Sequence, residues 1–232
     1  MVEIRRAGER GYADHGWLKS YHSFSFAGYH DSEHMGFGPL RVINEDRVAG
    51  GAGFGPHPHQ DMEIISYVLS GSLEHRDSMG TGSVIRAGDV QRMSAGSGVL
   101  HSEYNHSSDD PVHFLQIWIQ PDRIGIEPEY EQTTIPETAK RGRFRLVASP
   151  DGRNESMRIN ADAFMFAALV DGAERLDYAI APDRKIYLQV VRGSLKANDA
   201  ELETGDAIKI RDEESVTIEN GCRAEVLLFD LP

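Results

Sequence analysis

Four side chains that could bind a metal occur in this sequence as two pairs with the same spacing. His57 and His59 are two residues apart, and His101 and Glu103 repeat that spacing further along the chain. In a β-strand, residues i and i+2 project from one face about 6.6 Å apart, so each pair can reach one ion. Three imidazoles and one carboxylate suit a first-row divalent transition metal, whereas calcium and magnesium prefer an all-oxygen shell. Four protein ligands also leave open positions on a six-coordinate ion, as a catalytic metal requires.

The residues around these pairs favour a metal site over a chance arrangement. Gly55 and Pro56 precede the first pair, and the Gly-rich turn 95–98 precedes the second. A histidine without such a partner is more often structural or solvated. That interpretation applies to the other seven, His15, His22, His30, His34, His75, His106 and His113. Because no histidine follows position 113, any metal chemistry is predicted to belong to the N-terminal half.

Short runs of β-branched and aromatic residues alternate with turn residues along the whole chain. Glycine, serine and aspartate separate the runs, and helix-length amphipathic periods are hard to find. The pattern predicts an all-β fold, either a barrel or a sandwich. The clearest expected strands are 40–43, 63–69, 84–85, 113–119, 186–191 and 225–229.

An internal repeat indicates two related domains. The segment 67–73 is echoed by 189–195, and each copy is followed by a Gly-Asp turn, at Gly88 and at Gly205. A repeated order of strands and turns at this scale predicts two β-domains of one type. The second copy contains no histidine and cannot rebuild the same metal site, so we expect it to be a degenerate partner.

Composition and charge exclude some classes of function. The chain has 232 residues and a formal net charge of −13, with no run rich in lysine or arginine, which argues against direct binding of nucleic acid. No stretch approaches the length of a membrane span and the first residues lack an apolar leader, so we expect a cytoplasmic protein. Cys222 is the only cysteine. The apolar tail 226–229 is explained by core packing, and we expect a monomer.

Several motifs resemble a known family. The stretches 53–63 and 88–105 are similar to the two motifs of a cupin, a double-stranded β-helix related to the jelly roll. More specifically, five segments in the N-terminal half resemble the pirin family, while the C-terminal half resembles bacterial pirin-like quercetinases more diffusely. The five segments are 23–27, 37–42, 57–63, 73–78 and 101–105.

The resemblance implies a fold and an activity. It implies a bicupin with two barrels packed together, which divides the chain into a metal-binding domain at 1–130 and a degenerate domain without a metal site at 131–232. It implies one metal in the first domain, with Fe2+ expected first and Cu2+, Ni2+, Mn2+ or Zn2+ as alternatives. In bacterial members it implies quercetin 2,3-dioxygenase activity. Carried over residue by residue, the family's ligands fall on His57, His59, His101 and Glu103.

The carboxylate ligand has two candidates by spacing. Glu63 keeps the strand phase of the first histidine pair, and general cupins often use a glutamate at that place. The pirin pattern favours Glu103. We therefore expect Glu103 to be the ligand and Glu63 to lie behind the ligands, where it would orient a histidine through its free ring N–H.

The expected reaction is cleavage of a flavonol ring, with insertion of both atoms of O2 and loss of carbon monoxide. The metal lowers the pKa of the substrate hydroxyl, and Glu103 is the candidate base that receives the proton. A planar aromatic substrate requires an apolar pocket, for which Phe37, Phe54, Met93 and Trp118 are near in sequence, although ordinary core packing is the simpler interpretation of each. Two alternatives remain. One is a metal-dependent sensor or transcription-cofactor-like partner protein without turnover, and the other is a structural zinc site.

Overall fold

The computed structural model describes residues 1–232, which form two compact units. The N-terminal unit contains Gly11–Thr134 and Ile159–Ala161, and the C-terminal unit contains Met1–Arg10, Ile135–Arg158 and Asp162–Pro232. One four-residue α-helix and two 3-10 segments are the only helices, so the predicted all-β class is confirmed. None of these helices has the length and apolar character needed to cross a membrane.

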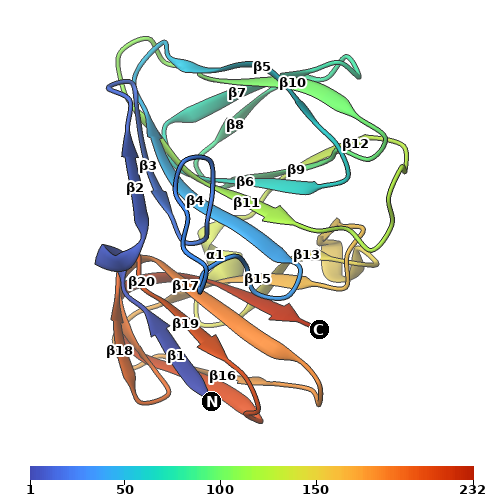
Figure 1. Ribbon diagram of the computed structural model, residues 1–232. Helices are drawn as coiled ribbons and strands as arrows, with labels where there is room; N and C mark the ends of the chain where they lie inside the picture. The colour runs from blue at the N-terminus through green and yellow to red at the C-terminus, as the bar shows by residue number, and fades with distance from the viewer. The chain divides into compact units, whose positions relative to one another are not determined.

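The N-terminal unit is built from two antiparallel sheets that face each other (Figure 1). One has four strands in the order β5-β10-β7-β8, and the other has seven in the order β12-β9-β6-β11-β4-β3-β2. The strands are β2 (Gly11–Asp14), β3 (Leu18–His22), β4 (Leu40–Val48), β5 (Gly53–His59), β6 (Glu63–Ser70), β7 (Ser72–Asp77), β8 (Gly82–Arg86), β9 (Asp89–Ser94), β10 (Val99–Asn105), β11 (Val112–Ile119) and β12 (Glu129–Thr134).

The C-terminal unit is organised around two long strands, β17 and β20, which pair with each other and with most of the rest. One apolar cluster fills its interior. The elements are β1 (Val2–Arg5), η1 (Ala7–Glu9), α1 (Glu137–Lys140), β13 (Arg145–Ser149), η2 (Arg153–Glu155), β14 (Met157–Arg158), β15 (Phe164–Val170), β16 (Arg175–Ala179), β17 (Lys185–Ala197), β18 (Ala200–Glu203), β19 (Ala207–Ile210) and β20 (Ser215–Leu231).

The sequence repeat is visible in the backbone of both units. Gly71 and Gly193 have φ values of 75° and 69°, a conformation that side chains other than glycine rarely adopt. A Cβ atom at either position would also collide with a neighbouring backbone. The same backbone bend, here called the corner glycine, therefore follows β6 in one unit and lies within β17 in the other. This correspondence fixes which residues of the two units are equivalent.

The interior of the N-terminal unit has a polar row where the C-terminal unit is apolar. Along the inward face of β6, Ser66 lies between Ile64 and Val68, which belong to two separate apolar clusters. Ser66 pairs with Gln116 on β11 and with Gln91 on β9. The row continues from Gln116 to Asn44 on β4. Its members Asn44, Ser66 and Gln91 are all at most 3% exposed.

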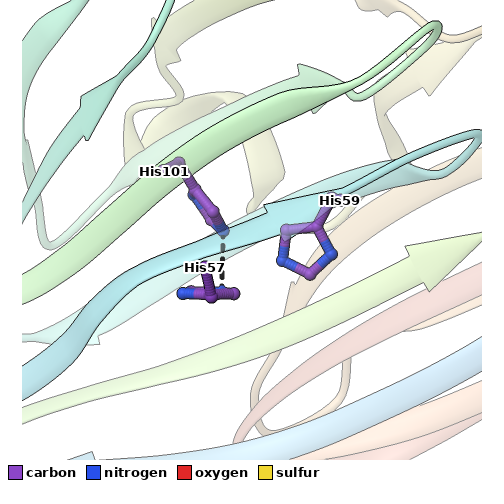
Figure 2. A group of neighbouring side chains, drawn as sticks. All are labelled: His57, His59 and His101. Carbon is purple, nitrogen blue, oxygen red and sulfur yellow. Dashed lines mark hydrogen bonds between the residues drawn. The ribbon is translucent and has the colours of Figure 1, made fainter.

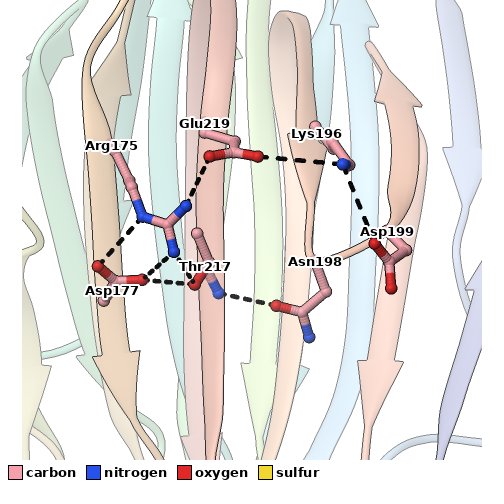
Figure 3. A network of polar contacts seen from close by, with 7 residues as sticks. All are labelled: Arg175, Asp177, Lys196, Asn198, Asp199, Thr217 and Glu219. Carbon is pink, nitrogen blue, oxygen red and sulfur yellow. Dashed lines mark hydrogen bonds and ion pairs between the residues drawn. The ribbon is translucent and has the colours of Figure 1, made fainter.

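The outer face of the C-terminal unit carries a network of ion pairs. Figure 3 shows Arg175 on β16 reaching Asp177 on its own strand and Glu219 on β20, with N–O distances of 3.2 and 2.8 Å. Lys196 on β17 extends the network toward Asp199. These side chains point to solvent and join neighbouring strands without entering the core.

The first ten residues belong to the C-terminal unit, whereas the division expected from the sequence put them in a domain spanning 1–130. The reason is that β1 pairs with β19, residue for residue from Val2 opposite Ile210 to Arg5 opposite Ala207. Ala7 N–H then donates to the Asp206 carboxylate at 2.7 Å and completes this edge.

Candidate metal centre

Three of the four predicted ligands meet at one point in the N-terminal unit. His57 and His59 come from β5 and His101 from the neighbouring β10, and their rings converge on the same space (Figure 2). One nitrogen from each ring lies within 4.8 Å of the others. The Nε2 atoms of His57 and His101 are 3.0 Å apart, since these residues are directly paired across the two strands.

The local sequence explains why β5 holds its histidines firmly. Pro56 and Pro58 alternate with the two histidines, and proline lacks the N–H that an interior strand needs. β5 is an edge strand with a neighbour on one side only. The N–H groups that the prolines lack can therefore be missing on the open side, where no strand would accept them. The prolines therefore restrict the backbone of β5 without disrupting the sheet.

The tautomer of His57 is fixed by the backbone. Its Nδ1 lies 2.8 Å from the carbonyl oxygen of Gly55, which has no proton to give, so Nδ1 carries the proton and donates it. The lone pair of the ring is then on Nε2, which faces His101. Such a hydrogen bond from the remote nitrogen is typical of metal-binding histidines.

The other two rings are held neutral. Burial, followed by the neighbouring rings of His57 and His75, lowers the pKa of His101 to about 3. Burial, followed by the rings of His101 and His57, lowers the pKa of His59 to about 4. Both imidazoles are therefore unprotonated near neutral pH, which is the form that binds metals.

Glu103 lies next to this cluster and is held from the opposite sheet. Gln116 Nε2 donates to its Oε2 at 2.6 Å, and the Ser66 hydroxyl is 3.1 Å from its Oε1. Glu103 is 1% exposed. It falls in a second group of possible ligands, with His75 and His101, whose donor atoms also lie within 4.8 Å of one another. His101 is thus common to both groups.

These residues fit a divalent transition metal. Two nitrogens bound at about 2.1 Å and at right angles to one ion are about 3.0 Å apart. The Nε2 atoms of His57 and His101 are at that separation. Neutral imidazoles with one adjacent carboxylate are the donor set that such ions take.

A cavity of about 650 Å3 opens beside the cluster, within the size range of small-molecule sites. His57, His59 and Glu103 form part of its lining. Aromatic rings make up much of the remaining wall, and two edge-to-face pairs are prominent, Trp17 with Phe54 and Phe26 with Trp118. Of the four apolar residues considered from the sequence, Phe54 and Trp118 line the cavity, whereas Phe37 and Met93 are buried core.

Glu63 does not have the role expected from its spacing. It accepts hydrogen bonds from Ser94 Oγ at 2.8 Å and Asn160 Nδ2 at 3.2 Å, and no histidine contacts it. The cause is the turn after His59, where β5 ends, because β6 begins at Glu63 in the other sheet. The alternation of side chains along β5 therefore does not predict which way the Glu63 side chain points.

His75 was missed by the sequence reasoning, which treated it as structural or solvated. It is fully buried on β7, opposite Glu103, and its Nε2 is 2.9 Å from Asp77 Oδ2. His15 and His22 were also missed, and both line the cavity. The spacing of His75 and Asp77 repeats the i, i+2 pattern, but its meaning depends on knowing that β7 pairs with β10.

Comparison with known proteins identifies the family of this chain. The family model described as Pirin matches residues 3–119, and the model described as the quercetinase C-terminal cupin domain matches residues 146–231. Quercetin 2,3-dioxygenase of Escherichia coli (strain K12) is 47% identical over 232 residues, which cover 100% of this chain and 99% of that protein. The chain belongs to the pirin family. The family and the two-cupin architecture predicted from the motifs are thus confirmed.

Other members of the pirin family agree along the full length. A pirin-like protein of Caulobacter vibrioides is 40% identical, with 99% of each chain covered. The crystal structure of a bacterial pirin from Escherichia coli in complex with nickel(II) superposes with a TM-score of 0.96 at 46% identity, covering 100% of this chain and 99% of that one. That relative binds a transition metal, in keeping with the histidine cluster described above.

Proposed function

We propose that this pirin-family protein is a metal-dependent dioxygenase that opens the flavonol ring of quercetin, or of a similar enol, and releases carbon monoxide. The observation that carries the proposal is the convergence of three imidazoles beside an aromatic cavity whose lining includes His57, His59 and Glu103. The names of the related quercetin 2,3-dioxygenases support the same reaction. The substrates would be a planar aromatic molecule and O2.

In this proposal His57, His59, His101 and Glu103 hold the metal. When bound, the ion would lower the pKa of the substrate hydroxyl by its charge and supply the open positions for the reaction. We infer iron(II) as the native metal, with copper, nickel, manganese and zinc as alternatives, because imidazole and carboxylate donors accept all of them and availability decides among them.

The remaining residues orient the substrate and move its proton. Glu103 would accept the hydroxyl proton at a carboxylate oxygen, while Gln116 and Ser66 keep that carboxylate directed at the cavity. The rings of Phe54 and Trp118 would contact the faces of a planar substrate and exclude water from it.

The test is turnover of quercetin by protein reconstituted separately with each of the five metals, with carbon monoxide as the measured product. We expect release with at least one redox-capable metal and its loss in His59→Ala. His106→Ala is the matched control, because this histidine of the same unit lies outside the cavity and bonds to Glu74. Absence of carbon monoxide with every metal, despite measured occupancy, would contradict the proposal and favour a sensor or partner protein.

A further inference from the structure

His75 and Asp77 form a buried pair beside the metal-binding histidines, and the proposed reaction gives neither of them a role. Both project from the inward face of β7, the strand that pairs with β10. Asp77 is opposite His101 in that pairing, and His75 is opposite Glu103. Both side chains are fully buried and neither lines the cavity, so they cannot act by touching a substrate. The ring of Tyr130 packs against His75, with the ring centroids 5.0 Å apart.

The hydrogen bonds of Asp77 set the tautomer of His75. Oδ1 of Asp77 accepts the backbone N–H groups of Met79 and Thr81, at 2.9 and 3.0 Å. Its Oδ2 lies 2.9 Å from Nε2 of His75. Because a carboxylate has no proton to give, Nε2 of His75 carries the proton and donates it. The lone pair of a neutral His75 ring is then on Nδ1.

A complementary nitrogen lies on His101. Its Nε2 is 3.0 Å from that of His57, where both would bind one metal, so the proton of the His101 ring is left on Nδ1. The Nδ1 atoms of His75 and His101 are both buried without a hydrogen-bond partner. The two ring centroids are 5.4 Å apart, close to the roughly 5.2 Å of two imidazoles joined by an N–H···N bond. Glu103, the third member of this group, is an acceptor and offers His75 no proton.

We propose that His75 is a positioning residue, which accepts a hydrogen bond from Nδ1–H of His101 and so directs Nε2 of His101 at the metal. Asp77 contributes by holding His75 in the tautomer that can accept this bond. His57 receives the same kind of support from the carbonyl oxygen of Gly55. The inference rests on the metal site of the proposed function and adds to it the two residues that orient the ligand from β10.

The sharpest test inverts the tautomer of His75 by replacing one oxygen with an NH2 group. In Asp77→Asn the single carbonyl oxygen must accept the two backbone N–H groups of the turn, so the amide NH2 is left facing Nε2 of His75. His75 is then protonated on Nδ1 and meets another proton on Nδ1 of His101. Zinc affinity, measured by competition with a chelator, should fall by about tenfold or more.

Two substitutions of His75 and one control separate the hydrogen bond from packing and charge. His75→Leu keeps the charge of Asp77 but removes the acceptor, and it should also lower zinc affinity by about tenfold. His75→Asn places an amide oxygen near the position of Nδ1 and should stay within about threefold of wild type. His113→Leu is the matched control, because Nε2 of His113 is also 2.9 Å from a carboxylate, that of Glu45, and neither residue lines the cavity. It should bind zinc as wild type does.

NMR of zinc-loaded protein with isotope-labelled histidine reads the hydrogen bond directly, because the ring nitrogen shifts show which nitrogen is protonated and which binds zinc. We expect His75 to be protonated on Nε2 and His101 on Nδ1, with the His101 proton far downfield in wild type and shifted upfield in His75→Leu. The inference is overturned if wild-type His75 is protonated on Nδ1 or itself binds zinc, or if Asp77→Asn and His75→Leu bind zinc as tightly as wild type. Zinc held as expected, in a protein that releases no carbon monoxide in the reconstitution test, would contradict only the proposed reaction.

Discussion

The two units of this protein differ most along one row of residues that crosses equivalent strands. In the N-terminal unit the row includes Gln116, Ser66 and Gln91. The corner glycines and Gly-Asp turns align these with Leu228, Leu188 and Ile208 of the C-terminal unit, which pair with one another in the same order. The same fold thus accommodates a polar row beside the cavity of the N-terminal unit and an apolar row in the closed core of the C-terminal unit.

The difference separates the requirements of folding from those of the site. Leu188, Leu228 and Ile208 are each 0% exposed and belong to one continuous cluster, as expected where burial of apolar surface is the main contribution. The N-terminal unit interrupts its interior with polar side chains, of which the Gln116 amide and the Ser66 hydroxyl hold Glu103. Natural proteins accept such unfavourable placements mainly at functional sites.

The largest effect is expected when the apolar row of the C-terminal unit is made polar. Leu228→Gln would place an amide in a core that offers it no partner, and we expect the free energy of unfolding to fall by about 3 kcal/mol or more. Urea denaturation measures this, with Leu228→Met as the control for shape. Stability equal to that of wild type would mean that the C-terminal interior admits water, and the contrast would fail.

The reverse substitution makes the polar row of the N-terminal unit apolar. Gln116→Leu gives the N-terminal unit the residue of its partner and removes the donor to Glu103, so metal affinity should fall by about tenfold or more while the fold is retained. Competition with a chelator measures the affinity, and thermal unfolding checks stability. An unchanged affinity would show that Glu103 needs no support from the facing sheet.

A pH-dependent difference is expected at Asp46, which is equivalent to Ala168. Burial, with smaller contributions from Glu103 and Glu45, raises the pKa of Asp46 from 3.8 to about 7. Between these two values the unfolded chain has released a proton that the folded chain keeps, so stability falls as pH rises toward 7. Asp46→Asn removes this dependence, and its Tm should exceed that of wild type by at least about 3 °C more at pH 8 than at pH 5. Parallel Tm curves would show that Asp46 ionises normally.

The smallest effect is expected at the solvent-exposed network of the C-terminal unit. Arg175 makes two ion pairs there but is largely exposed, and exposed pairs contribute little. Arg175→Ala should change Tm by less than about 2 °C at low salt, and even less at high salt. A larger loss would mean that the surface of this unit, and not only its core, holds the sheet together.

Spacing alone identified each pair of candidate ligands because the geometry within a pair is local. His57 and His59 share one strand, and i, i+2 periodicity is a property of any strand. Glu63 shows where that reasoning fails, since a turn after His59 moves it to the other sheet. Gln116 was not predicted because it reaches Glu103 only where the two sheets face each other, and no local sequence pattern encodes that contact.

The pairing of β1 with β19 has a consequence for synthesis of the chain. β1 leaves the ribosome before any strand of the N-terminal unit, whereas its partner β19 (Ala207–Ile210) is made after that whole unit. The N-terminal unit can begin to fold during translation, as domains usually do. The C-terminal unit must wait, with β1 unpaired until β19 has emerged. Deletion of residues 1–5 would therefore impair the maturation of the C-terminal unit, whose other strands are made much later.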